Sequence, residues 1–189
     1  MKPGTRNGLT AAFFNILLGL MILVSPQSTS ALMGDITNDP SKIVEKYLSL
    51  DSRGARLNAR SFEVLRPYIN WKEEPAWGSV VVISKYEVIE DVTQWTIINK
   101  LEALIPVTYQ VVGYMNWETA SFYAESHNEI QKFHIKEFQN QWKIVAPLIR
   151  PHVGKNRLLD FVRLERLNEV SKVKKAALRR LEEQLGKVK

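Results

Sequence analysis

Asp91, His127 and Tyr109 are the side chains of this sequence whose types could move a proton between them. Asp91 ends an acidic run at the close of a predicted strand, and His127 lies in a predicted turn at 125–128. Tyr109 lies on the apolar face of the longest predicted strand. A carboxylate or an imidazole beside a tyrosine hydroxyl can shift a proton and stabilise an oxyanion, which is isomerase or dehydratase chemistry. These three are the candidate catalytic residues.

Each of these candidates also has an ordinary structural explanation. Acidic runs and turn histidines are typical of a solvated surface, and tyrosines on an apolar face are typical of a core. No motif links the three positions. The pattern therefore favours a protein without catalytic activity, and an enzyme is the alternative.

Metal and cofactor chemistry find no support in the sequence. The chain has no cysteine, which excludes thiolate nucleophiles, thiolate metal ligands and disulfides. No two of its three histidines have i, i+4 spacing, and no Gly-rich phosphate loop or Ser-centred elbow occurs. We expect neither a metal ion nor a cofactor.

A second group of side chains has the types that line an apolar pocket. Its members are aromatic or branched residues on predicted core faces, and packing in an ordinary core is the alternative explanation. The candidate pocket residues are Tyr47, Tyr86, Val107, Tyr109, Trp117 and Trp142.

The elements that position these residues begin with two helices. Asp39 and Pro40 form a helix start signal, and Val44, Tyr47 and Leu48 then fall on one face, as in an amphipathic helix. Turn residues at 51–54 end that helix. A second short helix is predicted from about residue 61 and must end near Pro67.

From residue 79 onward the pattern alternates, which indicates strands. We predict strands over 80–90, 94–98, 103–117 and 130–138, with a final strand over 141–149 after a turn at 139–140. Odd positions of 103–117 are apolar, and Gly113 inside this run predicts a bend. Short connections make the sheet antiparallel.

Two helices followed by such a sheet, closing on the runs FHIK (133–136) and QWKIV (141–145), resemble the nuclear transport factor 2-like superfamily. The resemblance covers about residues 39–154. It implies a cone, in which a curved sheet wraps a long helix around an apolar pocket. Members use that pocket for isomerase or dehydratase chemistry, for ligand binding, or for dimerisation and assembly, so the resemblance does not choose among these functions. The expected fold class is α+β, with N-terminal helices on a curved antiparallel sheet and a long C-terminal amphipathic helix.

The C-terminal tail is basic and has helical periodicity. Residues 155–189 carry 11 Lys and Arg against 5 Asp and Glu, whereas residues 32–154 carry 13 against 15. We predict one helix over about 156–185, or two helices joined near Ser171, that packs on its own domain or on a second copy. An anionic membrane surface is the alternative partner, and no motif points to nucleic acid. The candidate contact residues are Arg163, Arg166, Lys174, Arg179 and Arg180.

The N-terminus has the layout of a secretory signal peptide. Lys2 and Arg6 precede an apolar run over 9–24, and small residues follow at 28–31. The run is 16 residues long, shorter than the roughly 20 apolar residues that a membrane span needs. We expect cleavage after Ala31 and a periplasmic or extracellular protein, and an uncleaved inner-membrane anchor is the alternative. The predicted organisation is a signal peptide (1–31), a cone domain (32–154) and a helical tail (155–189).

Three functions follow from these patterns. The first is an exported, non-catalytic binding or assembly module whose apolar pocket or sheet face takes a protein partner or a small apolar ligand, with a homodimer as one form of partner. The second is the small isomerase or dehydratase. The third is a membrane-surface adaptor that acts through the tail.

Overall fold

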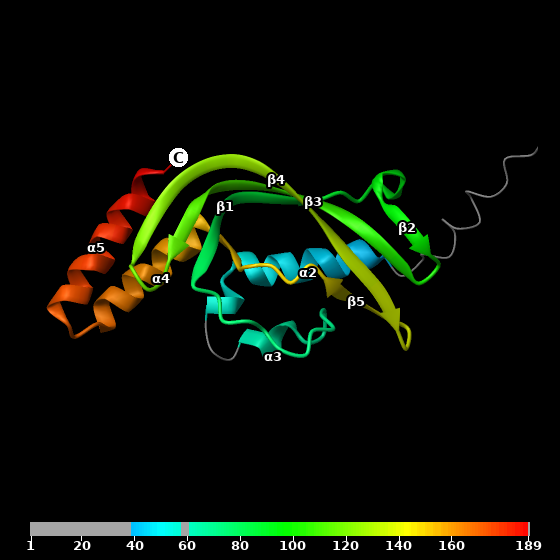
Figure 1. Cartoon of the computed structure of the whole chain (residues 1–189), viewed down its shortest axis with the longest axis horizontal. Coiled ribbons are helices and arrows are strands. Elements are labelled where there is room, and N and C mark those ends of the chain that lie inside the picture. Colours follow the sequence, from blue (N-terminus) through cyan, green and yellow to red (C-terminus); the bar gives the residue numbers. More distant parts are fainter. Residues whose placement is uncertain (1–38, 58–60, 189) are drawn as a thin grey trace, which may run out of the picture.

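The computed structural model describes residues 39–57 and 61–188, and within them a curled sheet lies over a central helix (Figure 1). The predicted signal peptide lies outside the described residues. Helix α2 (Pro40–Ser52) starts at the predicted proline. Asp39 accepts a hydrogen bond from the hydroxyl of Ser41 and makes no side-chain cap to the helix. A short turn η1 (Ala55–Leu57) and helix α3 (Ser61–Leu65) follow.

The sheet is built around two long strands. Strands β1 (Ser79–Val88), β3 (Glu102–Asn116), β4 (Ser121–Phe138) and β5 (Gln141–Ala146) pair as antiparallel neighbours in the order β5-β4-β3-β1. Strand β2 (Thr96–Asn99) follows the turn η2 (Val92–Gln94) and pairs with β3. Strand β6 (His152–Gly154), which the sequence pattern did not indicate, pairs with β1 in parallel.

Two irregularities curl the sheet and change which side chains face inward. Pairing of β3 with β4 shifts register between Val111 and Gly113, and pairing of β1 with β3 shifts around Ile83. An extra residue at a bulge reverses the alternation of side chains beyond it. Tyr109 therefore faces the concave side, whereas Met115 faces the other side, although both occupy odd positions. The expectation that all odd positions of 103–117 share one face is wrong beyond the predicted bend.

The concave face closes over α2 and forms the main core. Val44 and Tyr47 of α2 are fully buried there against side chains of β3, β4 and β5. The cluster brings together residues that are far apart in the sequence, such as Ile43, Val107 and Ile144. This confirms the predicted α+β class, with helices packed on a curled, mostly antiparallel sheet.

The tail forms a helical hairpin on the opposite face of the sheet. Helices α4 (Lys155–Asn168) and α5 (Lys172–Lys187) are separate, and the hydroxyl of Ser171 caps α5, as in the two-helix alternative (Figure 1). Their buried side chains form a second core with outward-facing residues of β1, β3 and β4. Its fully buried members include Val80, Val82, Met115, Leu158, Val162, Leu181 and Leu185. No helix of the described residues is long and apolar enough to span a bilayer.

Candidate functional site

The structure does not bring Asp91, His127 and Tyr109 together. Asp91 is exposed and accepts hydrogen bonds from the hydroxyl (2.6 Å) and the backbone N–H (2.9 Å) of Thr93, which lower its pKa and cap η2. His127 lies inside β4 rather than in a turn, opposite Val111, because β4 already begins at Ser121. Of the three, only Tyr109 is a buried member of the concave core.

Five of the six candidate pocket residues share that interior. Tyr47, Val107, Tyr109 and Trp142 are buried in the concave core, and Tyr86 packs against it. Trp117 lies elsewhere, against the second core, because the bulge at Gly113 turns it to the other side.

A buried arginine that the sequence patterns did not single out crosses the concave interior. Arg56 Nε donates to Glu74 Oε1 (2.5 Å), Nη1 donates to the hydroxyl of Tyr47 (3.0 Å), and Nη2 donates to the carbonyl of Ile149 (2.7 Å). Its Nη1 also lies 3.6 Å from Oδ2 of Asp51, and neither side chain is exposed. One guanidinium therefore links α2, the segment before β1 and the segment after β5.

Asp51 and His152 form the other half of this polar group. Asp51 Oδ2 accepts the backbone N–H of His152 at 3.0 Å, which fastens the end of α2 to the start of β6. Burial raises the pKa of Asp51 to about 6, although the positive charge of Arg56 acts to lower this pKa. Burial also lowers the pKa of His152 to about 4, so its imidazole is neutral at pH 7.

The His152 ring stacks on Tyr109 with the ring centroids 4.3 Å apart. Its Nδ1 lies 2.8 Å from the carbonyl oxygen of Arg150, so Nδ1 carries the proton and donates. Nε2 is then an acceptor, and among the described residues neither it nor the Tyr109 hydroxyl has a hydrogen-bond partner. Burial raises the pKa of Tyr109, so its hydroxyl stays protonated.

His152 also lines a pocket of about 300 Å³. Glu129 and Arg150 place one charge of each sign at its border. The complete lining is Trp77, Val81, Tyr114, Glu129, Leu148, Ile149, Arg150 and His152.

A larger hollow of about 740 Å³ lies between the α4–α5 hairpin and the β3–β4 turn, and we call it the hairpin pocket. Trp117, directly after β3, and Phe161 of α4 meet edge to face there, with ring centroids 5.4 Å apart. Leu57, Ala120, Ala177 and Leu178 complete the apolar lining, and the polar lining is Glu118, Thr119, Glu165, Glu169 and Lys174.

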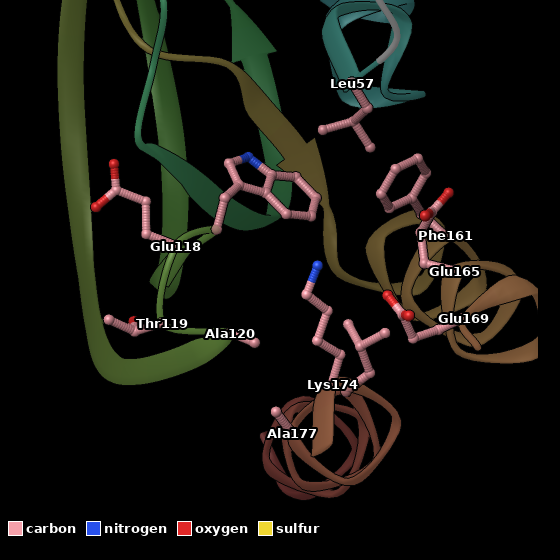
Figure 2. A pocket seen from close by; sticks show the side chains of 11 residues that line it. Leu57, Glu118, Thr119, Ala120, Phe161, Glu165, Glu169, Lys174 and Ala177 are labelled. Atoms are coloured by element: carbon pink, nitrogen blue, oxygen red, sulfur yellow. The ribbon is translucent and has the colours of Figure 1, made fainter. Parts of the chain in front are cut away.

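The polar side chains of the hairpin pocket carry both signs of charge. Figure 2 shows Lys174 reaching in from α5 at the bottom, Phe161, Glu165 and Glu169 on the α4 side, and Leu57 above Phe161. Glu169 Oε1 accepts the backbone N–H of Ser171 at 2.8 Å, which holds the link between the two helices. An apolar volume with a few charged groups is the usual form of a small-molecule site.

Most of the candidate tail contacts are engaged within the hairpin itself. Arg163 and Arg166 both donate to Glu182, at 2.9 and 3.0 Å, and Arg179 pairs with Glu183 at 3.2 Å. Lys174 lines the hairpin pocket, and Arg180 is exposed. The acids that pair with these arginines belong to the same tail, so the number of basic residues in the tail overstates how many are free to contact a partner.

Among the described residues no three histidine or acidic side chains gather in a way that could hold a metal ion. Comparison with known proteins adds no relative to this picture: no family model matches the chain, and neither a curated protein nor a solved structure matches it.

Proposed function

We propose that this chain is an exported, non-catalytic binding module whose hairpin pocket takes a small amphipathic ligand. The observation that carries the proposal is the Trp117–Phe161 pair, which lines a hollow of about 740 Å³ at the edge of the second core. Ligand pockets have volumes of roughly 300–1,000 Å³ and mostly apolar walls with few polar groups. A ligand with an apolar body and a polar end would place the body on the two rings and the end near Lys174.

The concave interior also favours the hairpin pocket as the binding site, because side chains of the protein itself occupy much of that interior. Tyr47, Tyr109 and Phe133 are fully buried there, and Arg56 fixes the surrounding polar atoms. These side chains thus take up space in which the sequence predicts a pocket, and the pocket of about 300 Å³ that His152 lines is smaller than the hairpin pocket. The curled sheet over α2 also supports a place in the nuclear transport factor 2-like superfamily, which we keep as a proposal.

The binding proposal can be tested with anilinonaphthalene sulfonate, which has an aromatic body and one charged group. The chain has five tryptophans, so incorporation of fluorotryptophan gives one fluorine NMR signal for each. We expect the probe to shift the Trp117 signal and to leave the signals of Trp95 and Trp142, which are buried in the concave core, in place.

Two variants complete this experiment. Phe161→Ala should weaken probe binding about tenfold, because it removes half of the aromatic wall. Tyr123→Ala is the matched control, since Tyr123 is an exposed aromatic on β4 that does not line the hairpin pocket. Equal binding by both variants, or a shift of the buried tryptophans instead of Trp117, would rule out the hairpin pocket as the site.

A second candidate function is the isomerase or dehydratase, now resting on His152 and Tyr109. The observation in its favour is that Nε2 of His152 and the hydroxyl of Tyr109 are both buried without hydrogen-bond partners among the described residues, on two rings that stack. A pKa of about 4 makes His152 a weak base, which favours hydrogen bonding over proton abstraction. Deuterium exchange at the α-carbon of cyclohexenone tests this second function. If exchange is no faster with the wild-type protein than with the His152→Asn variant, His152 does not act as a base.

Export is proposed on the signal-peptide pattern alone. Expression of the whole chain in a bacterial host, followed by mass spectrometry of the periplasmic fraction, should give a product that begins at Leu32. A product that keeps its first residues and sediments with membranes would instead support the anchor.

A further inference from the structure

The end of the α4–α5 hairpin carries apolar side chains that nothing in the described structure covers. We call this region the hairpin tip and define it by Leu164, Leu167, Val170 and Val173, which are 53, 68, 94 and 80% exposed. The tip is formed where α4 ends and α5 begins, at the end of the hairpin farthest from α2 (Figure 1). Isolated exposed apolar residues are common, but four within ten positions of one turn make a patch.

Two exposed lysines without ion pairs among the described residues lie beside this tip. Lys172 and Lys175 are exposed at the start of α5, and neither has an ion pair within the described part of the chain. The neighbouring acids are directed elsewhere, since Glu165 and Glu169 line the hairpin pocket. Lys174, between the two lysines, also lines that pocket. The tip therefore presents apolar side chains beside two lysines that make no ion pair in the described structure, while the two acids of the same segment line the hairpin pocket.

We propose that the hairpin tip docks on an anionic lipid bilayer, with its leucines and valines in the headgroup region and Lys172 and Lys175 on lipid phosphates. Apolar burial combined with attraction to anionic lipid is how surface helices bind membranes. A second copy of the chain is disfavoured as the occupant, because pairing two tips would bring like charges together. Arg163 and Arg166 stay on Glu182 and take no part.

The absence of cysteine from the chain makes a local test possible. Val170→Cys gives a single thiol at the tip for an environment-sensitive nitrobenzoxadiazole fluorophore. Ile130→Cys, at a 66% exposed position on β4, is the matched control. The whole chain is mixed with vesicles of phosphatidylcholine, either pure or mixed with phosphatidylglycerol. The predicted signal peptide can bring the protein to either vesicle, but the fluorophore reports only its own surroundings.

We expect a blue shift and a severalfold rise in emission at residue 170 with the anionic vesicles, and no change at residue 130. Adding Lys172→Glu and Lys175→Glu to Val170→Cys should abolish the response while the circular dichroism spectrum stays unchanged. Equal emission at residue 170 in both kinds of vesicle would overturn the proposal. An emission change at residue 170 that occurs without vesicles and grows with protein concentration would also overturn it, because it would indicate that a second copy of the chain binds the tip. Probe binding in the hairpin pocket is measured without vesicles, so either proposal can fail alone.

Discussion

Arg56 is the residue on which most of the buried polar interactions of the cone depend. It donates to Glu74, Tyr47 and the Ile149 carbonyl, and it lies 3.6 Å from Asp51. Removing one member of a buried charged group leaves its partners without compensation, which costs about 3–5 kcal/mol. One side chain of the short turn η1 thus pairs with several of the buried polar groups of the concave core.

Arg56→Ala should therefore lower the free energy of unfolding by about 3–5 kcal/mol, measured by urea denaturation at pH 7. Arg53→Ala is the control, because the Arg53 side chain is exposed and its hydrogen bonds to Ser49 and Arg157 are made by its backbone N–H and carbonyl. We expect the control to change stability by less than about 0.5 kcal/mol. Equal losses in the two variants would show that the guanidinium contacts contribute little.

Asp51 and His152 make the folding stability depend on pH with opposite signs over the same pH range. The pKa of Asp51 is raised from 3.8 to about 6, so the folded state binds this proton more tightly and stability falls as pH rises through that range. The pKa of His152 is lowered from 6.5 to about 4, so the folded state binds its proton less tightly and stability rises over that range. Each contribution is about 3 kcal/mol, and the two largely cancel.

Replacing one of the two residues should leave the pH dependence of the other visible. Between pH 4 and 6.5, the stability of His152→Asn should fall relative to wild type as pH rises, because the opposing Asp51 effect remains. The stability of Asp51→Asn should rise relative to wild type over the same interval. Urea unfolding at several pH values measures both slopes, and parallel curves for all three proteins would contradict the assigned pKa shifts.

At the scale of elements, the bulge at Gly113 decides which residues of β3 reach each core. Gly113 has a φ of 154°, and a Cβ there would lie 2.2 Å from the carbonyl oxygen of Tyr123 and 2.5 Å from the ring of Phe122. Only glycine allows the two strands to approach so closely at this point. Trp117 reaches the hairpin pocket because the alternation reverses here.

Gly113→Ala should cost about 2 kcal/mol or more in unfolding free energy, since it combines a steric clash with an unfavourable φ. Gly186→Ala is the matched substitution, because nothing lies within 4 Å of its Cβ position in α5. It should stabilise the protein by up to about 1 kcal/mol through helix propensity. Thermal denaturation followed by circular dichroism compares the two, and a neutral Gly113→Ala would show that the bulge tolerates a side chain.

Local sequence signals predicted the elements better than they predicted their faces. Pro40 began the first helix, Ser171 divided the tail, and Asn140 took the positive φ of the last hairpin turn, because each signal acts within a few residues. The side of the sheet on which Trp117 lies depends on register shifts, which an alternating pattern does not record. The burial of Arg56 and His152 depends on partners from distant segments, so no local pattern could have identified them.

On the scale of the whole molecule, one sheet separates two cores. The concave core is closed by α2, and the opposite core is closed by the α4–α5 hairpin. Val80 and Val82 of β1 face the hairpin while Val81 and Ile83, between and beyond them, face α2. A strand that is apolar on both faces needs cover on both faces. The hairpin is therefore part of the packed structure as well as the wall of its larger pocket.

A chain that ends at Gly154 should consequently lose stable folding, although it keeps every strand and α2. Without the hairpin, Val80, Val82 and Met115 would be exposed to water, at about 1.5–3 kcal/mol for each fully buried side chain. That loss equals much of the roughly 5–15 kcal/mol by which a domain is stable. Urea unfolding of residues 32–154 should show no cooperative transition.

Leu181→Ala, which keeps the hairpin, should unfold cooperatively with a loss of about 2–5 kcal/mol. A cooperative transition of wild-type midpoint in the shorter chain would show instead that the cone domain folds independently of its tail.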